Sequence, residues 1–329
     1  RRTRIAHHDG FYVDQDYLVT GEMTKIRENG ATTGVGVLAT FVYDDLGRRT
    51  SLTRGNGTTA SYSYDAVSRL SQLVDNPTGA THDQTLGFTY NPASQIVSNT
   101  RTNDLFAFAP PIATQTTPVN GLNQLTSVTG TSVAHDLRGN LTAESGRSYG
   151  YTSENLLGSM TYVGTTSLAY DPLMRLHQLV GWSGPKFTYD GMNLALETHF
   201  TSGAVQRRFV HGPGVDEPLV QYEGSGTTDR RFLHADERGS IVAQSDATGA
   251  VTAVNRYDEY GQPHGPSGAG TLAGRFGYTG QAWLPELGLW YYRARMYNAR
   301  IGLRASRSAT RGSGNAPSCA LHSLPVSSM

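Results

Sequence analysis

The stretch SYSYDAVSRLSQLV, residues 61–74, contains the pattern on which the fold depends. Serine and tyrosine alternate before Asp65, so Tyr62 and Tyr64 lie on the same face of a strand. Asp65 begins a short polar turn, because an Asp side chain at the first position of a type I turn caps backbone N–H groups. An apolar-rich run follows from Leu70. The order strand, tight turn, strand predicts a β-hairpin.

The same unit recurs along the chain. It consists of an aromatic residue or His, then Asp or Asn, two variable residues, a Gly or small polar residue, a polar residue and an apolar one. Weaker copies begin at Val119 and Tyr151. Because an isolated hairpin is only marginally stable in water, we expect the units to pair edge to edge in one long twisted sheet. The fold class predicted is all-β. The residues assigned to repeat turns are Tyr43, Asp44, Gly47, Tyr64, Asp65, Tyr90, Asn91, Asp136, Gly139, Tyr170, Asp171, Tyr189 and Asp190.

Composition excludes several other classes of protein. The 329 residues carry 27 basic and 27 acidic side chains, and this zero net charge argues against a nucleic-acid or anionic-membrane partner. No apolar run is long enough to cross a bilayer. The single cysteine, Cys319, forms neither an internal disulfide nor a Cys-based zinc cluster. Only Lys25 and Lys186 are lysines, and the sequence alone gives no reason for this arginine bias.

Several blocks near the C-terminal side are more specific than the repeat itself. They read HGPGVDEPLV (211–220), FLHADERGSI (232–241), YDEYG (257–261), FGYTGQ (276–281) and GLWYYRARMY (288–297). In these blocks and in its repeat, the chain resembles the RHS (rearrangement hotspot) or YD-repeat family over roughly residues 10–302. By this resemblance the family's core signature falls on Gly280, Gln281, Gly288, Tyr291, Tyr292, Arg293, Arg295 and Tyr297.

The resemblance implies a fold and a biological setting. Its members form a hollow shell of spiralling antiparallel β-hairpins around a polymorphic toxin, as in the C component of insecticidal toxin complexes and in the shell of teneurins. We therefore expect YD-repeat sheet over residues 1–205, a core-associated segment over 206–302, and a tail over 303–329. The tail has seven serines, no acidic residue and no aromatic residue, so we expect it to be disordered and read it as the product of a frameshift or a truncated gene copy.

The family's usual cleavage block is altered in this sequence. Where the resemblance predicts Tyr-Tyr-Asp-Pro, the chain reads Met296-Tyr297-Asn298-Ala299. Aspartyl self-cleavage needs two acids that share a proton, so this substitution disfavours a self-cleaving shell.

Other chemical sites receive a simpler interpretation. Two glycine-rich stretches, 34–39 and 55–60, fit a loose dinucleotide fingerprint, but no helical pattern follows either, which favours turns. His7-His8-Asp9 lacks the spacing of a zinc helix, so we predict no metal site there. Taken with the turn interpretation of the glycine-rich stretches, the sequence predicts no metal, no cofactor and no catalytic residue. The aromatic cluster around Trp290 is predicted to be a buried plug rather than a platform that stacks sugar rings.

The function predicted is a structural fragment of a toxin-enclosing shell in bacterial competition, secreted or associated with the cell surface, and not an enzyme. Its expected partners are a C-terminal toxin cargo in a full-length relative and a secretion apparatus or a cell-surface glycan. The alternative is an adhesive module whose repeat surface binds glycans or another protein. The chain begins in patterned sequence without a leader, so it is expected to be a piece of a longer protein.

Overall fold

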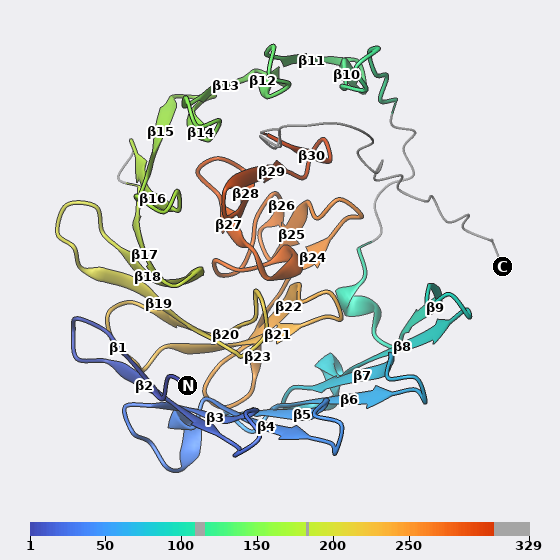
Figure 1. Ribbon diagram of the computed structural model, residues 1–329, viewed down its shortest axis with the longest axis vertical. Helices are drawn as coiled ribbons and strands as arrows, with labels where there is room; N and C mark the ends of the chain where they lie inside the picture. Colours follow the sequence, from blue (N-terminus) through green and yellow to red (C-terminus); the bar gives the residue numbers. More distant parts are fainter. Residues whose placement is uncertain (109–115, 182–183, 306–329) are drawn as a thin grey trace.

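The computed structural model describes residues 1–108, 116–181 and 184–305. Within these ranges the regular secondary structure is almost entirely antiparallel strands that pair in sequence order, which confirms the predicted all-β class (Figure 1). The helical elements described are four short 3-10 turns: η1 (Gly34–Gly36), η2 (Ala80–His82), η3 (Asp104–Phe106) and η4 (Tyr278–Gly280). No helix in the described part of the chain is both long enough and apolar enough to span a bilayer.

The first sheet has nine strands. They are β1 (Arg4–Ala6), β2 (Tyr12–Tyr17), β3 (Met23–Glu28), β4 (Ala39–Tyr43), β5 (Arg49–Arg54), β6 (Thr59–Tyr64), β7 (Leu70–Asn76), β8 (Gln84–Tyr90) and β9 (Ile96–Arg101).

The second sheet has fourteen strands. They are β10 (Ser127–Val128), β11 (Thr131–His135), β12 (Leu141–Glu144), β13 (Arg147–Tyr151), β14 (Leu157–Thr161), β15 (Thr165–Tyr170), β16 (Leu176–Val180), β17 (Lys186–Asp190), β18 (Asn193–Thr198), β19 (Val205–His211), β20 (Pro218–Glu223), β21 (Arg230–Ala235), β22 (Ile241–Ser245) and β23 (Val251–Val254).

Two small sheets complete the described chain. The first contains β24 (Arg256–Tyr257), β25 (Pro263–Gly265) and β26 (Gly268–Ala269), and the second contains β27 (Ala282–Leu284), β28 (Leu289–Tyr292), β29 (Arg295–Asn298) and β30 (Leu303–Arg304).

The second sheet bends into an arc, and the chain after it folds back inside that arc (Figure 1). The concave face of the arc contributes Leu176, Leu179 and Phe187 to one apolar cluster. The C-terminal segment contributes Leu289 and Met296 to the same cluster. We call residues 276–305 the inner segment. Its apolar side chains, which are shielded from water by the arc, provide much of the core of this half of the molecule.

The first sheet packs against the opposite face of the second sheet at β19–β21. Neighbouring residues on these strands therefore belong to different cores. Phe209 on β19 and Leu233 on β21 join the cluster of the inner segment, whereas the adjacent Val210 and Phe232 join the cluster of the first sheet. The middle of the molecule is thus three layers thick. Strands of the arc, such as β15, bury alternate residues, but β18, β20 and β22 are buried on nearly every residue.

The large sheets of the described chain divide between β9 and β10, and the second of them ends at β23. The predicted domain boundary at residue 205 falls on the first residue of β19, and the second sheet continues through it without a break in strand order. Residues 102–126 connect β9 to β10, and within them residues 109–115 lie outside the described ranges. Residues 303–305 of the predicted tail are described and pair with β29, whereas 306–329 lie outside the described ranges.

Candidate functional site

The repeat turn is an Asx turn in which one carboxylate organises four residues. At Asp65, Oδ1 accepts hydrogen bonds from the backbone N–H groups of Val67 (3.0 Å) and Arg69 (2.9 Å). The N–H of Ser68 donates to the Asp65 carbonyl (3.0 Å), and Ser68 itself has a φ of +68°. That left-handed position explains the preference for Gly or a small polar residue at the fourth place of the turn.

The same geometry recurs at the other predicted turns. The shared contact is a hydrogen bond from the N–H of the residue four positions later to the side-chain oxygen of the Asp or Asn. It is present at Asp44, Asn91, Asn120, Asp136 and Asp171.

Three further Asx turns were not identified from the sequence. They are formed by Asp236, Asp246 and Asp258, and each is followed by Gly at the fourth position, at Gly239, Gly249 and Gly261. Each carries the signal Asp-x-x-Gly, and Asp236 and Asp258 lie within the family's core blocks.

Asp190 forms a different turn. It pairs with Asn193 across a two-residue hairpin in which Gly191 has a φ of +58°. Its carboxylate binds the guanidinium of Arg2 with distances of 2.5 and 2.6 Å. Asp190 is therefore a link to the first strand rather than an Asx cap, because the glycine two places earlier than usual shortens the loop.

The tyrosine of each repeat fastens its hairpin to the hairpin before it. The Tyr64 hydroxyl donates to the carbonyl of Arg49 at 2.8 Å, and Arg49 is the residue at which the strand register of the preceding hairpin shifts. A bulge of this kind leaves one backbone carbonyl without a partner in the strand ladder, and the tyrosine hydroxyl donates a hydrogen bond to that carbonyl. Equivalent bonds join Tyr90 to Leu70, Tyr151 to Leu141, Tyr170 to Leu157, Tyr189 to Leu176 and Tyr257 to Ile241.

Arginine at the fifth position connects the turn to the next tyrosine. Arg69 Nε donates to Asp65 Oδ2 at 2.7 Å, and its guanidinium lies 4.6 Å from the centre of the Tyr90 ring. Arg48 and Arg175 repeat this arrangement with their own neighbours. A planar guanidinium binds a carboxylate and stacks on a ring at once, which an ammonium group does not match. This accounts for arginine rather than lysine at these positions.

The core-signature residues lie together in and around the inner segment. Tyr291 Oη accepts a hydrogen bond from the buried N–H of Leu176 at 2.8 Å. Gly280 has a φ of +72°, and a Cβ there would clash with the carbonyl oxygen of Asp216. Gln281 is buried, and Gly288 has a φ of +64°. Three other members make side-chain hydrogen bonds: Arg293 with the Asp216 carboxylate (2.6 Å), Tyr292 with the Thr279 hydroxyl (2.6 Å) and Tyr297 with the Tyr260 carbonyl (2.7 Å). Arg295 pairs with Tyr292 in the register of β28 and β29.

The inner segment uses the bulges of the arc as attachment points. Three bulge residues, each of which follows a repeat turn, donate a hydrogen bond from their backbone N–H group to the inner segment. These bonds are Leu141 N–H to the Ala305 carbonyl (3.0 Å), Leu176 N–H to Tyr291 Oη (2.8 Å) and Ile241 N–H to the Gly277 carbonyl (3.0 Å).

Trp290 is fully buried within this segment and packs 4.8 Å, centre to centre, from Trp283. Its Nε1 donates to the Gly261 carbonyl at 2.8 Å. A ring in this position has no face free to stack on a sugar, so the aromatic cluster is part of the core.

The altered cleavage position is a buried amide beside a buried carboxylate. Asn298 Nδ2 donates to Glu144 Oε1 at 3.0 Å, and Tyr149 and Arg300 donate to the same oxygen at 2.8 and 2.6 Å. Burial by itself would raise the pKa of Glu144, but the Tyr149 hydrogen bond and the charge of Arg300 outweigh it and hold the pKa below its usual range. Asn298 is thus a neutral donor to a charged acceptor, which is different from two carboxyl groups that share one proton.

One buried cluster has the connectivity of a Ser–His–Asp triad. His234 Nδ1 lies 2.7 Å from Asp75 Oδ2, and His234 Nε2 lies 2.8 Å from Ser245 Oγ. Hydrolases use these atoms in this order. Here, however, His234 and Ser245 are both 0% exposed, so a substrate has no route to the hydroxyl group. No sequence pattern indicates this cluster, because Asp75 and His234 are 159 residues apart.

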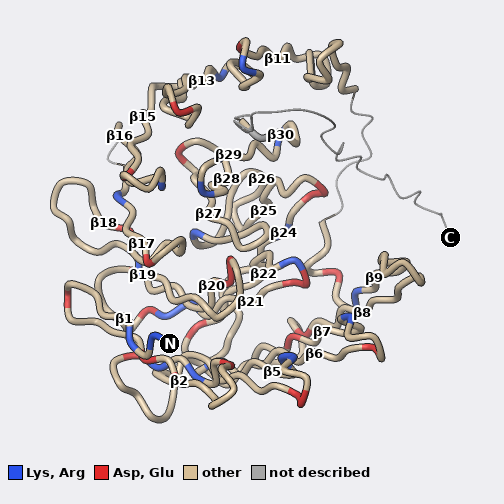
Figure 2. Tube along the Cα trace, in the orientation of Figure 1, with Lys and Arg blue, Asp and Glu red and all other residues tan. Residues whose placement is uncertain are grey.

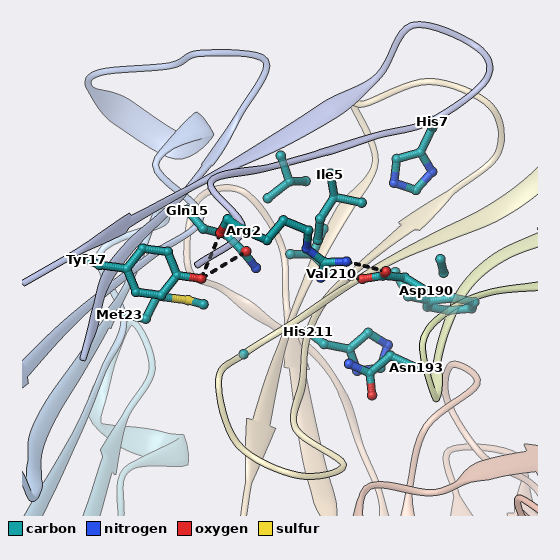
Figure 3. A pocket seen from close by; sticks show the side chains of 14 residues that line it. Arg2, Ile5, His7, Gln15, Tyr17, Met23, Asp190, Asn193, Val210 and His211 are labelled. Carbon is teal, nitrogen blue, oxygen red and sulfur yellow. Dashed lines mark hydrogen bonds and ion pairs between the residues drawn. The ribbon is translucent and has the colours of Figure 1, made fainter. Parts of the chain in front are cut away.

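A cavity of about 380 Å³ lies between the first strands and the β18–β19 region (Figure 3). Its polar lining includes the Arg2–Asp190 ion pair and the hydroxyl of Tyr17, which lies 3.0 Å from the Arg2 carbonyl and 3.2 Å from Gln15 Oε1, either of which can accept its proton. His7 also lines it, and burial lowers the pKa of His7. The charges present are already paired, so the cavity has no uncompensated charge that would define the charge of a ligand.

Acidic and basic side chains are interspersed along the described chain (Figure 2). In the described ranges, no group of three or more His, Cys, Asp or Glu side chains is placed to hold a metal ion. Asp9, from the His7-His8-Asp9 stretch, pairs instead with the buried guanidinium of Arg208.

These turns, tyrosine links and nested inner segment define a hairpin-repeat shell protein. Residues 43–81 match the family model described as the RHS Repeat. This match confirms the predicted resemblance to the RHS or YD-repeat family at the repeat itself.

Two curated relatives carry WapA names. The tRNA3(Ser)-specific nuclease WapA of Bacillus spizizenii is 29% identical over 202 residues, and the tRNA nuclease WapA of Bacillus subtilis strain 168 is 28% identical over the same length. Each alignment covers 59% of this chain and 8% of the relative, so the chain matches only a small part of those proteins.

Solved structures match nearly the whole chain. The Photorhabdus luminescens Tc holotoxin pore superposes with a TM-score of 0.63 at 16% identity, over 92% of this chain and 19% of that one. A TcdB2–TccC3-TEV structure gives 0.65 at 15% identity, over 93% and 20%. At this identity the likeness shows the fold, which is that of the toxin-complex shells.

Proposed function

We propose that this chain is a structural part of a shell wall that encloses a C-terminal toxin, secreted or displayed at the cell surface in bacterial competition. The observation that carries the proposal is the curved fourteen-stranded sheet whose concave face receives the chain's own C-terminal segment. In this arrangement the described chain reaches residue 305 on the inner side of the arc. The WapA nucleases and the Tc toxin structures support this setting by their similarity.

Protease protection tests the proposal. A product that carries this chain followed by a C-terminal toxin domain is treated with proteinase K before and after mild denaturation. Enclosure predicts that the toxin survives as an intact band in the native sample and disappears once the wall is unfolded. Digestion of the toxin at the same rate in both samples would contradict enclosure.

We further propose that the chain has no catalytic activity of its own, including self-cleavage. The Asn298–Glu144 contact and the burial of Ser245 support this. Intact mass after prolonged incubation is expected to be unchanged, and a fluorophosphonate probe is expected to leave Ser245 unmodified at neutral pH. One defined cleavage product, or stoichiometric labelling of Ser245, would overturn the proposal.

Glycan adhesion is the competing function. It requires an exposed aromatic platform, and Trp290, the strongest sequence candidate, is buried. Saturable binding on a glycan array would favour adhesion over enclosure.

A further inference from the structure

The buried cluster around His234 joins the two large sheets. Asp75 lies on β7 of the first sheet, whereas His234 and Ser245 lie on β21 and β22 of the second. Arg54, at the end of β5, donates from Nη1 to Asp75 Oδ1 (3.1 Å) and from Nε to the Leu233 carbonyl (3.1 Å). The cluster is therefore one of several polar links, together with the Glu28–Arg230 and Arg49–Glu217 ion pairs, that flank the apolar cluster between the two sheets.

Only one protonation state satisfies every donor and acceptor in this link. The Asp75 carboxylate accepts only, so His234 Nδ1 carries the proton and donates to it. A neutral His234 then accepts the Ser245 hydroxyl proton at Nε2. Asn56 Oδ1 accepts from Thr58, which orients Nδ2 to donate to Ser245 Oγ at 2.8 Å.

A second proton on His234 breaks this match. Nε2 then becomes a donor toward Ser245 Oγ, which already receives a hydrogen bond from Asn56, and the hydroxyl proton of Ser245 loses its acceptor. The new positive charge also lies beside the guanidinium of Arg54, whose charge already balances that of Asp75. An unsatisfied polar hydrogen and an excess charge in a dry interior both oppose the closed arrangement.

We infer that the Asp75–His234–Ser245 cluster is an acid-sensitive latch, in which protonation of His234 loosens the contact of β7 with β21 and β22. The inference concerns the chain itself and holds whether or not a toxin is enclosed. It predicts local loosening rather than separation of the sheets, because the apolar cluster and the Glu28–Arg230 ion pair still join them.

The direction of the pH effect follows from burial. Burial lowers the pKa of His234, and Arg54 lowers it further. The unfolded or opened state therefore takes up the proton first, so closure is complete above a pH of about 6.5 and is lost as the pH falls below it. Burial opposes the charge on Asp75, but contact with His234 and Arg54 keeps its pKa below the usual range, so Asp75 responds only at more acidic pH.

Other groups must be separated from the latch. His82, on η2, is the remaining titratable side chain that acts on His234. His211 on β19 is partly buried, has a pKa that desolvation lowers, and titrates in the same direction. Asp236 and Asp258 have raised pKa values through burial and act in the opposite direction, since they favour the folded state as the pH falls. Location along the chain distinguishes these contributions.

Hydrogen–deuterium exchange of the full chain at pH 7.5, 6.0 and 5.0, corrected for intrinsic rates, tests the latch. The corrected exchange rates of peptides from β7, β21 and β22 are expected to rise about tenfold for each pH unit below 6.5. The corrected exchange rates of peptides from β13–β15 of the arc should not change with pH. The variant His234→Asn keeps a neutral donor for Asp75 and should remove the pH dependence. His177→Asn, the same change at an exposed site on β16, should preserve it.

Equal pH dependence in the latch and arc peptides of the native chain would overturn the inference. So would a pH dependence at β7 that survives in His234→Asn. The comparison within the native chain decides the question even if His234→Asn fails to fold.

Discussion

Tyr291→Phe isolates the contact between the inner segment and the arc. The substitution removes one oxygen atom and keeps the ring, so the packing of the ring in the shared core is preserved. What is lost is the acceptor for the Leu176 N–H, which lies 2.8 Å from Tyr291 Oη at a fully buried residue.

The magnitude follows from the cost of a buried donor without an acceptor, which is about 1–3 kcal/mol. We expect Tyr291→Phe to lower the free energy of unfolding by about 2 kcal/mol. Urea denaturation followed by the fluorescence of Trp283 and Trp290, both buried in the inner segment, measures it, with the slope m unchanged. Exchange of the Leu176 amide should accelerate in parallel.

Tyr260→Phe is the matched control. The Tyr260 side chain is 38% exposed, so removal of its hydroxyl should change stability by less than about 0.5 kcal/mol. If Tyr291→Phe behaves like this control, the assignment of Tyr291 as the acceptor for an arc amide is refuted.

Three other perturbations test the cleavage position, the turn and the arginine link. Asn298→Asp places a second carboxylate beside Glu144 and should lower the free energy of unfolding by about 3 kcal/mol at pH 7. This loss should decrease as the pH falls, because the two carboxyl groups then share a proton. A loss that is independent of pH in urea titrations would contradict this. Asp171→Ala removes the acceptor for two backbone N–H groups and should lower the free energy of unfolding by about 2 kcal/mol in the same assay. Asp171→Asn keeps that acceptor and should lower it by about half as much. Equal losses for the two variants would argue against capping. Arg69→Lys loses both the Nε hydrogen bond to Asp65 and the stack on Tyr90, so thermal unfolding should show a loss of about 1 kcal/mol in the free energy of unfolding. An unchanged midpoint would refute the link.

Local features of the fold could be predicted from the sequence, because each repeat turn is determined by residues within five positions of one another. Asp65 and its cap are an example, and the alternation of Tyr62 and Tyr64 identified the strand before it. The shortened turn at Asp190 shows the limit, since Gly191 allowed a tighter loop than the repeat pattern implied.

Long-range features could not be predicted, because they depend on which strands meet after the sheet bends. The burial of β20 on both faces and the approach of Asp75 to His234 are of this kind. Asn298 could be singled out by its departure from the family pattern, but its partner Glu144 could not, as 154 residues separate them.

The central claim is that the C-terminal segment folds inside the arc and binds its bulges. The most direct measurement is the nuclear Overhauser effect between the Leu176 amide proton and the ring protons of Tyr291, in a sample labelled at leucine and tyrosine. The 2.8 Å contact predicts a strong cross-peak. An assigned, slowly exchanging Leu176 amide with no cross-peak to any tyrosine ring would contradict the claim.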